Sequence, residues 1–485
     1  MASEICYVKI DRENFEYDVN AIFKAFYPER GIKVLVPASR EYQSGQELFG
    51  EIRFGLRDIR MRIEDREYEW QMRPGDMEEK RYKDGFKRFL YQCLKRHTGR
   101  NLPWGNLTGI RPTKIAYGML EEGKSEKEIL EFYHTKHFVS EEKSRLSIDI
   151  AKRERELLQD VHYEGGYSLY IGIPFCPTTC LYCSFTSYPI ASFRKLVDQY
   201  VDCVIQEMEY VAKRYADKVL DSVYIGGGTP TTLEPAQLDR LLTKLKELFD
   251  FSQVKEFTVE AGRADSITED KLQVLYKHGV GRISVNPQTM KQETLDIIGR
   301  RASVDQVCAA YELARKVGFD NINMDLILGL PGESPEDVQC TIDRVVELAP
   351  DSLTVHSLAI KRASKLNQWI QENGVSMLNN TDTTMRIASE GAERLGMKPY
   401  YLYRQKNMSG NFENVGYAKP GKYGLYNILI MEEMQTIVAL GAGSITKRVY
   451  PDGRIERSEN IKDVTLYIEK IDEMLERKGT LFSPK

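Results

Sequence analysis

The sequence lacks the features that mark exported and membrane-spanning proteins. Its N-terminus, MASEICYVKID, has no basic segment followed by an apolar one, and its most apolar later stretch, NILIMEEMQTIVALGAG, is interrupted by Glu432 and Glu433. A helix that crosses a bilayer needs about 20 consecutive, mostly apolar residues. We therefore expect a cytoplasmic protein with no membrane span.

The sequence also has little net charge and few cysteines. A formal net charge of -4 and a pI near 6.1 provide no general attraction to nucleic acid, so we expect no nucleic-acid partner. Of the eight cysteines, five are widely separated: Cys6, Cys93, Cys203, Cys308 and Cys340. Such spacing is not that of a disulfide framework and favours a reducing compartment.

A change of pattern near residue 165 indicates more than one domain. Before it, residues 47–73 alternate as strands do, and residues 78–98 and 140–159 have the apolar spacing of amphipathic helices. After it come six apolar runs, each followed by helical spacing, for example over 195–216, 234–249 and 303–317. The runs are YSLYIGI, SVYIGGG, EFTVEA, RISVNP, NINMDLILGL and DSLTVHSLA. Six β-then-α units predict an α/β fold with a parallel sheet covered by helices.

We place the domain limits at the changes in pattern. The prediction is an α+β module over 1–162, a β/α partial barrel over 163–365 and an α+β extension over 366–485 that covers the substrate. In the extension we expect a helix over 381–395, strand-like pieces around 399–403 and 425–440, and a terminal helix near 461–477.

Three cysteines lie close together in YIGIPFCPTTCLYCSF, residues 170–185. Cys176, Cys180 and Cys183 form a CxxxCxxC pattern on a loop that contains two prolines. A structural zinc ion would need a distant fourth ligand, a redox pair needs only two thiols, and three buried structural thiols in one loop would be unusual. On a four-iron cluster, three thiolates leave one iron without a protein ligand, where a cofactor can coordinate.

Other candidate residues also follow strand ends. The stretch YIGGGTPT, residues 224–231, is not a phosphate-binding Walker loop, because no GKS or GKT follows; it is either a tight turn or a close approach of backbone to a ligand. Glu260 closes the third apolar run and Gln288 follows the fourth. Because active sites of parallel sheets lie at the carboxyl ends of the strands, we expect these positions to meet.

The cysteine spacing, with an aromatic residue before the last cysteine, resembles the signature of radical S-adenosylmethionine (SAM) enzymes. The region 167–360 is similar in detail to the oxygen-independent coproporphyrinogen III oxidase family. That family's pattern includes YxHIPFCxxxCxYC, GGGTPT, a glutamate closing the third strand, Q and R spaced by twelve, and NxDLIxGLP. The PWGNLTGIRPTK stretch and the overall length are most similar to the HemZ branch of that family.

The resemblance implies a [4Fe-4S] cluster and one SAM, with room for a second. Cys176, Cys180 and Cys183 would hold the cluster, Tyr182 would cover the adenine, and Tyr170 would lie near cluster and substrate. The residues that would contact SAM are Gly226, Gly227, Gly228, Thr229, Glu260, Gln288, Arg300, Asp325 and, by its backbone, Ala359. Taken without the family, Glu260 and Asp325 are equally explained as buried structural carboxyls, and Arg300 as half of a surface charge pair.

The family activity implied is the removal of a hydrogen atom from two propionate side chains of coproporphyrinogen III by a 5′-deoxyadenosyl radical, with loss of carbon dioxide. The product is protoporphyrinogen IX, a step of haem biosynthesis. A low-potential electron donor such as flavodoxin or ferredoxin is also implied. A substrate with four propionates requires cations, for which Arg404 and Lys406, or Lys361 and Arg362, are candidates.

Two departures from the family pattern keep other functions open. Gly172 and Phe185 stand where the decarboxylating enzymes carry a histidine and a fourth cysteine. The related haem chaperones also lack that cysteine, but their HNxxYW haem motif corresponds here to YNILIM, in which we expect Tyr426 to be a packed or surface residue. A radical enzyme acting on tRNA would need a basic domain or a second cysteine cluster, and the sequence has neither.

Overall fold

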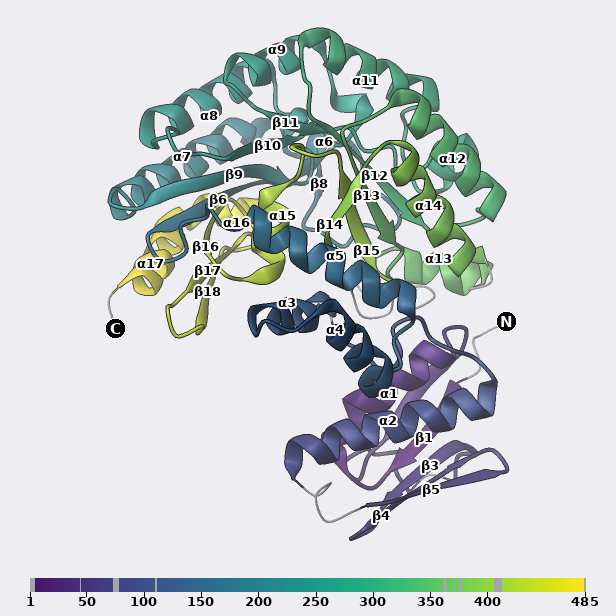
Figure 1. Ribbon diagram of the computed structural model, residues 1–485. Helices are drawn as coiled ribbons and strands as arrows, with labels where there is room; N and C mark the ends of the chain where they lie inside the picture. The colour runs from purple at the N-terminus through teal and green to yellow at the C-terminus, as the bar shows by residue number, and fades with distance from the viewer. Residues whose placement is uncertain are drawn as a thin grey trace.

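The computed structural model describes residues 5–43, 45–72, 78–109, 111–360, 364–374, 377–404 and 412–483. The first of its sheets has five strands in the order β2-β1-β3-β4-β5, and it carries helices α1 and α2 (Figure 1). The strand-like alternation over 47–73 and the helical spacing over 78–98 are confirmed as β3 to β5 and α2. The bounds are β1 Ile5–Ile10, η1 Glu13–Phe15, α1 Glu16–Phe26, β2 Gly31–Leu35, β3 Leu48–Phe54, β4 Asp58–Ile63, β5 Arg66–Gln71 and α2 Glu79–Thr98.

The second sheet has eleven strands, and its six central strands are the predicted parallel ones. Their order is β13-β12-β11-β10-β9-β6, and every neighbouring pair is parallel. The sheet curves, and helices α7, α8, α9, α11 and α12 follow its outer side (Figure 1). The strands are β6 Gly166–Ile173, β9 Val219–Gly227, β10 Glu256–Glu260, β11 Arg282–Ser284, β12 Ile322–Leu328 and β13 Ser352–Ser357. The helices between them are α7 Val197–Arg214, α8 Pro235–Leu248, α9 Glu269–Lys277, α10 Gln292–Ile297, α11 Val304–Val317 and α12 Pro335–Leu348.

Two of the outer helices, α11 and α12, begin at serine capping residues. Ser303 accepts a hydrogen bond from the backbone N–H of Gln306 at the start of α11, and Ser334 accepts one from Asp337 at the start of α12. In both cases the third residue of the helix bonds back to the cap, so two backbone N–H groups are satisfied together. These caps fix the residue at which α11 and α12 begin, and so fix where the loops that precede them end.

The last part of the chain extends the same sheet at both ends. β14 Lys398–Tyr403 and β15 Asn414–Ala418 add to the edge formed by β13, and β16 Thr436–Leu440 runs parallel to β6 at the other edge, followed by β17 Ile445–Val449 and β18 Ile455–Glu459. The helices are α13 Leu366–Asn373, α14 Asp382–Arg394, α15 Leu425–Glu432, α16 Val464–Glu469 and α17 Ile471–Phe482. Small elements near the first strand are β7 Phe175–Cys176, β8 Tyr188–Pro189, α6 Ile190–Phe193 and η4 Arg194–Leu196, and η5 Pro230–Thr232 and η6 Ala264–Ser266 follow later strands.

One expectation in this part was partly wrong. Strand-like pieces were expected around 425–440; the strand β16 is present there, but the stretch begins with helix α15 and becomes a strand only at Thr436. Buried residues lie on several sides of α15, including Tyr426, Ile428 and Leu429. A helix that is apolar all round has no polar face, so its sequence shows no helical period and cannot be told from a buried strand. The predicted helix near 461–477 is present as the two successive helices α16 and α17.

The first 162 residues contribute to two apolar cores. Residues 8–102 form one core of their own, whereas Trp104, Ile129, Tyr133 and Ile148 pack into the main core together with the eleven-stranded sheet. The elements involved are α3 Thr113–Glu121, α4 Glu126–Phe132, the π-helix η3 Tyr133–His137 and α5 Glu141–Leu157, and α5 packs on β14. The domain limits given above stay a prediction. In the described part of the chain, the helices are too short or too polar to cross a bilayer.

A buried ionic contact joins the PWGN stretch to the large sheet. The indole N–H of Trp104 donates to the carboxylate of Glu413 at 2.6 Å, and the ammonium of Lys143 approaches the same carboxylate at 2.8 Å. Trp104 is fully buried and Glu413 is 1% exposed. Because Glu413 directly precedes β15, the contact connects the N-terminal helices to the edge strands of the sheet.

We expect Trp104→Phe to lower the free energy of unfolding by about 1–3 kcal/mol, because it keeps an aromatic ring but removes the indole N–H that donates to a buried carboxylate. Denaturant unfolding measures this difference. Trp70→Phe is the control, since Trp70 packs by its ring against Tyr82 and Phe89. Equal effects of the two substitutions would contradict a specific contribution of the Trp104–Glu413 bond.

Candidate active site

A cavity of about 680 Å³ lies at the carboxyl edge of the parallel strands. Its lining comes from the loop after β6, the turn after β9, the ends of β10 to β13, α15 and β16. Of the predicted site residues, these line it: Tyr170, Cys176, Cys180, Tyr182, Cys183, Gly227, Gly228, Thr229, Glu260, Gln288, Arg300 and Asp325. Gly226, in β9 next to Gly227, and Ala359, after β13, are not among the lining residues.

The cysteine loop is held by backbone hydrogen bonds to distant segments. The N–H of Tyr188 donates to the carbonyl of Pro174 at 2.8 Å, and β7 pairs with β8. Leu181 donates to the carbonyl of Ile298 and accepts from the N–H of Leu366, each at 3.0 Å. The three thiols are therefore fixed by residues 115 or more positions further along the chain as well as by their own loop.

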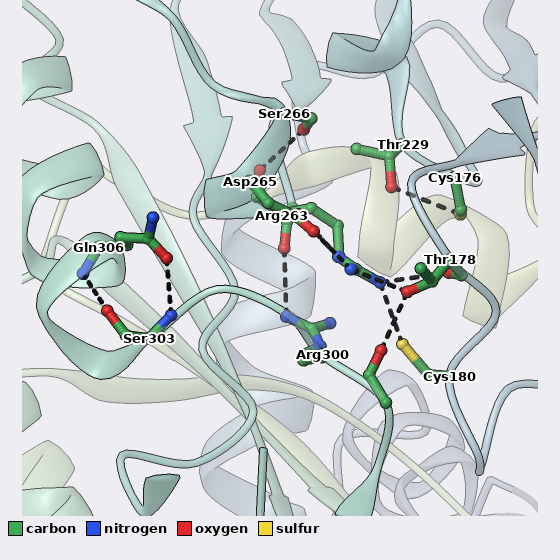
Figure 2. A network of polar contacts seen from close by, with 12 residues as sticks. Cys176, Thr178, Cys180, Thr229, Arg263, Asp265, Ser266, Arg300, Ser303 and Gln306 are labelled. Carbon is green, nitrogen blue, oxygen red and sulfur yellow. Dashed lines mark hydrogen bonds and ion pairs between the residues drawn. The ribbon is translucent and has the colours of Figure 1, made fainter. Parts of the chain in front are cut away.

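Each cysteine sulfur faces a polar group. The hydroxyl of Thr229 donates to Sγ of Cys176 at 3.4 Å, and Nη1 of Arg263 donates to Sγ of Cys180 at 3.4 Å (Figure 2). The Ser187 hydroxyl lies 3.8 Å from Sγ of Cys183. Sulfur atoms that receive hydrogen bonds are typical of iron–sulfur cluster ligands, whose potential depends on such bonds.

The three cysteines offer thiol ligands for a metal cofactor. Among the described residues, no group of three or more His, Cys, Asp or Glu side chains is arranged to hold a single metal ion. Burial raises the pKa of Cys176 to about 11, so its thiol stays protonated unless a metal takes up the thiolate. Three thiols around one cavity with donors to their sulfurs are the set that a [4Fe-4S] cluster with one open iron would require.

The glycine turn after β9 leaves no room for side chains. The N–H groups of Gly228 and Thr229 donate to the carbonyls of Ile173 and Phe175 at 2.8 and 2.7 Å. A Cβ on Gly228 would lie 2.6 Å from the Phe175 carbonyl oxygen, and one on Gly226 would lie 2.8 Å from the carboxyl carbon of Glu260. Gly227 has a φ of +105°, which favours glycine. The turn thus packs its backbone directly against the cysteine loop.

Two carboxyl groups face the cavity from the next strands. Glu260, at the end of β10, accepts a hydrogen bond from the Tyr224 hydroxyl at 2.5 Å. Burial raises the pKa of Glu260 to about 7, helped by the nearby Asp325. Asp325 accepts from the Asn323 amide at 2.7 Å, and His356 Nε2 lies 4.0 Å from it. A carboxyl group at the edge of ionisation can accept from an ammonium or a hydroxyl of a ligand.

Buried polar atoms without protein partners line the same cavity. Gln288 has a φ of +69° and its backbone bridges β12 through Asp325 and Ile327, but its side-chain oxygen has no partner. The Nε of Arg300 is likewise buried and without a partner, although its other nitrogens donate to the Tyr182 hydroxyl at 3.2 Å and to the Asn286 carbonyl. An unsatisfied buried group costs about 1–3 kcal/mol, which a bound ligand would recover. Arg300 is therefore not half of a surface charge pair, the alternative that the sequence left open.

Three stacked tyrosines form one wall. Tyr224 and Tyr426 stack with ring centroids 4.5 Å apart, and Tyr170 stacks with both at 6.3 and 6.1 Å. Tyr426 is 5% exposed, as expected for a packed residue. Tyr224 and Arg263 were not predicted from the sequence as site residues. Tyr224 lies in YIGGG, within the second predicted strand, and Arg263 lies in EAGRAD, at the end of the third.

Arg404, one of the cations expected to bind propionates, does not line the cavity. Arg404 is buried on the other side of β14, where it donates to the carbonyl of Leu107 at 2.7 Å and lies over the ring of Trp104. Because side chains alternate along a strand, Tyr401 and Tyr403 face the cavity and Arg404 does not. Lys406, Lys361 and Arg362 lie outside the described residues.

Gly172 and Phe185, the two positions that depart from the decarboxylase pattern, both line the cavity. A Cβ on Gly172 would lie 3.3 Å from the carbonyl oxygen of Leu440 on β16, so a histidine there would press against that strand. Phe185 is 71% exposed and lies on the rim of the cavity. Both positions are thus part of the cavity wall.

The raised pKa of Glu260 predicts a pH-dependent stability. A carboxyl with a higher pKa when folded contributes stability at low pH and loses it as pH rises through about 7. We expect Glu260→Gln to raise the free energy of unfolding relative to wild type by roughly 1–3 kcal/mol more at pH 8 than at pH 5, measured by urea unfolding without cofactors. Glu209→Gln, at an exposed carboxyl on α7, is the control. A pH-independent difference would contradict the shift.

Comparisons with known proteins show the family of this chain. Residues 170–345 match the radical SAM superfamily. The chain is 39% identical over 404 residues to the oxygen-independent coproporphyrinogen-III oxidase-like protein HemZ of Bacillus subtilis strain 168, covering 82% of this chain and 81% of that protein. It is 36% identical over 195 residues to the heme chaperone HemW of the same strain, covering 40% of this chain and 51% of that protein.

A solved structure is also similar. Coproporphyrinogen III oxidase (HemN) from Escherichia coli, described as a radical SAM enzyme, matches with a TM-score of 0.52 and 25% identity over 66% of this chain and 72% of that one. Proteins of the radical SAM superfamily use a [4Fe-4S] cluster and SAM, as the cysteine pattern predicts. The chain therefore belongs to the radical SAM superfamily and, within it, to the HemZ-like branch of the haem-related oxygen-independent coproporphyrinogen III oxidase family.

Proposed function

We propose that this protein is a radical SAM oxidoreductase that converts coproporphyrinogen III to protoporphyrinogen IX without oxygen. The observation that carries the proposal is one cavity that combines three cysteine sulfurs, the glycine turn and partnerless polar atoms of Gln288 and Arg300. The HemZ relative, matched over most of both chains, has a name that refers to the same reaction.

In this proposal Cys176, Cys180 and Cys183 hold the cluster and the remaining residues hold SAM. The turn from Gly226 to Thr229 presents its backbone to the methionine amino group. The unpartnered Nε–H of Arg300 would donate to the carboxylate of SAM, and the unpartnered side-chain oxygen of Gln288 would accept from an ammonium or hydroxyl group of SAM. Glu260 and Asp325 accept from the ammonium or the ribose hydroxyls, the Tyr182 ring covers the adenine, and Ala359 contacts it by its backbone.

When bound, the cluster and SAM supply a 5′-deoxyadenosyl radical that removes a hydrogen atom from the β-carbon of a propionate. The chain itself binds, orients and excludes water. The stack of Tyr170, Tyr224 and Tyr426 provides an aromatic wall of the cavity, and burial raises the pKa of all three phenols, so they stay neutral.

The electron balance requires two partners of the protein. Each propionate loses a hydrogen atom, an electron and carbon dioxide to become a vinyl group, and each SAM cleavage consumes one electron. We propose a low-potential donor such as flavodoxin or ferredoxin for the electron that SAM cleavage consumes, and a separate acceptor for the electron that the propionate loses. A second SAM and a cytoplasmic location remain part of the proposal.

The rim offers cations for propionates. Lys447 and Lys462 line the cavity, and the ammonium of Lys447 lies 2.9 Å from the carboxylate of Glu433. A substrate carboxylate that displaced Glu433 would form a new ion pair with Lys447, while the exposed Phe185 ring would contact the macrocycle. Buried Arg404 has no part in this arrangement.

The second candidate function is haem carriage, which the similarity to HemW favours. The position matching the chaperone haem motif is Tyr426. Its ring is enclosed by Tyr224 and Tyr170, and burial raises the pKa of its phenol well above 10, which disfavours the tyrosinate that would ligate haem iron. These contacts support catalysis over haem carriage.

The test is anaerobic reconstitution with iron and sulfide, followed by coproporphyrinogen III, SAM, dithionite as the reductant and an added one-electron acceptor, with mass analysis of the products. We expect protoporphyrinogen and 5′-deoxyadenosine from wild type and neither from Cys180→Ala, because the variant cannot complete the cluster site. Cys340→Ala, at an exposed cysteine on α12, is the matched control and should retain both products. Product formation by Cys180→Ala would contradict the assignment.

An absorption titration with haem separates the two functions. We expect weak, unspecific haem binding that does not change in Tyr426→Phe, because the phenol is enclosed by other rings. Tight stoichiometric binding by wild type, lost in Tyr426→Phe and accompanied by no decarboxylated product, would instead establish the carrier.

A further inference from the structure

Arg263 occupies an unusual position beside the cysteine loop. It follows β10, its side chain is 5% exposed, and it points at the loop between Cys176 and Cys180 (Figure 2). Its Nη1 donates to the carbonyl of Thr178 at 3.2 Å and to Sγ of Cys180 at 3.4 Å, and its Nη2 donates to the hydroxyl of Thr178 at 3.1 Å. One guanidinium therefore contacts backbone, side chain and sulfur of the same loop.

The remaining hydrogens of Arg263 hold it in place. Nε and Nη2 donate to the two carboxylate oxygens of Asp265 at 3.0 and 2.7 Å. A guanidinium has five N–H donors in a fixed plane, and these bonds use all five. Three point at the cysteine loop and two at Asp265. Lysine, with three donors on a flexible stem, cannot reproduce this arrangement.

The backbone around Arg263 is tied to the glycine turn. The Ser266 hydroxyl donates to the carbonyl of Arg263 and lies 2.7 Å from the hydroxyl of Thr231 (Figure 2 shows Ser266 beside Arg263). Thr231 belongs to the GGGTPT stretch whose Thr229 contacts Cys176. Arg263 is thus fixed to the same framework that positions the first cysteine.

From this geometry we infer that Arg263 is a positioning residue for the iron–sulfur cluster: it fixes the cysteine loop through Thr178 and raises the reduction potential by donating to the Cys180 sulfur. A hydrogen bond from a cation withdraws electron density from a ligand sulfur and favours the reduced cluster. Arg300 also interacts with Cys180, so removal of Arg263 lowers the potential without removing all positive charge. The inference rests on the cluster ligands proposed above, but not on the substrate.

Four variants separate the two effects. Arg263→Met removes both, Arg263→Lys keeps the charge but not the fork, and Thr178→Val removes an anchor of the loop but leaves the bond to sulfur. Arg301→Met is the control, because it deletes an exposed guanidinium next to Arg300. Each is reconstituted anaerobically, and we measure the rate of cluster loss to a chelator and the midpoint potential by electron paramagnetic resonance, without substrate.

We expect Arg263→Met to lose its cluster about 10-fold faster than wild type and to have a more negative midpoint potential. Arg263→Lys should lose its cluster faster at a potential nearer to that of wild type, and Thr178→Val faster at an unchanged potential. Arg301→Met should match wild type in both. Wild-type values for Arg263→Met would overturn the inference.

The outcome is distinguishable from a failure of the proposed function. If Arg263→Met does not fold, as circular dichroism of the apoprotein shows, Arg263→Lys and Thr178→Val decide: wild-type loss rates in both overturn the inference and faster rates in both support it. If wild type takes up no cluster, both proposals fail. If the Arg263 variants behave as expected but no porphyrinogen is decarboxylated, only the proposed function fails.

Discussion

The contact on which the site depends is the one between the backbones of two neighbouring turns. Gly228 and Thr229 donate their N–H groups to the carbonyls of Ile173 and Phe175, immediately before the first cysteine. A single methyl group at Gly228 would lie 2.6 Å from the Phe175 oxygen, so the approach exists only with glycine at that position. Through it the Thr229 hydroxyl reaches Cys176, and the cysteine loop receives a fixed position relative to Glu260 and the strands beyond. A parallel sheet supplies the framework, because adjacent strands end at the same edge.

The C-terminal part of the chain builds the cavity as much as the parallel strands do. β16 lies alongside β6, so Gly172 must pass the Leu440 carbonyl closely, and α15 places Tyr426 against Tyr224. The glycine that replaces the family histidine thus has a packing reason: it accommodates a strand. Because glycine at position 172 can be explained by its close packing against β16, Gly172 alone is weak evidence that decarboxylation was lost.

Much of this arrangement could be predicted from the sequence, and the exceptions have physical causes. The six strands were identifiable because each is an apolar run that ends at Gly, Pro or a charged residue, and the cysteine spacing identified the loop. α15 was missed because a helix buried on several sides has no polar face to give it a period. Arg404 was misplaced because a motif does not show which face of a strand a side chain occupies. Arg263 was missed because its partners on the cysteine loop, Thr178 and Cys180, are distant in the sequence and are brought to it only by the tertiary structure.

The distribution of unsatisfied groups favours a protein built to bind a polar cofactor. The Gln288 oxygen and the Arg300 Nε are buried at the cavity without partners, and Glu260 is held at a pKa near 7 by burial. Each of these features lowers the stability of the empty fold, whereas apolar residues at the same positions would raise it. Such groups persist where a ligand with a carboxylate, an ammonium and hydroxyls completes them, and SAM carries all three. A haem carrier would need an apolar slot and a free axial ligand instead, and the enclosed phenol of Tyr426 is a poor one.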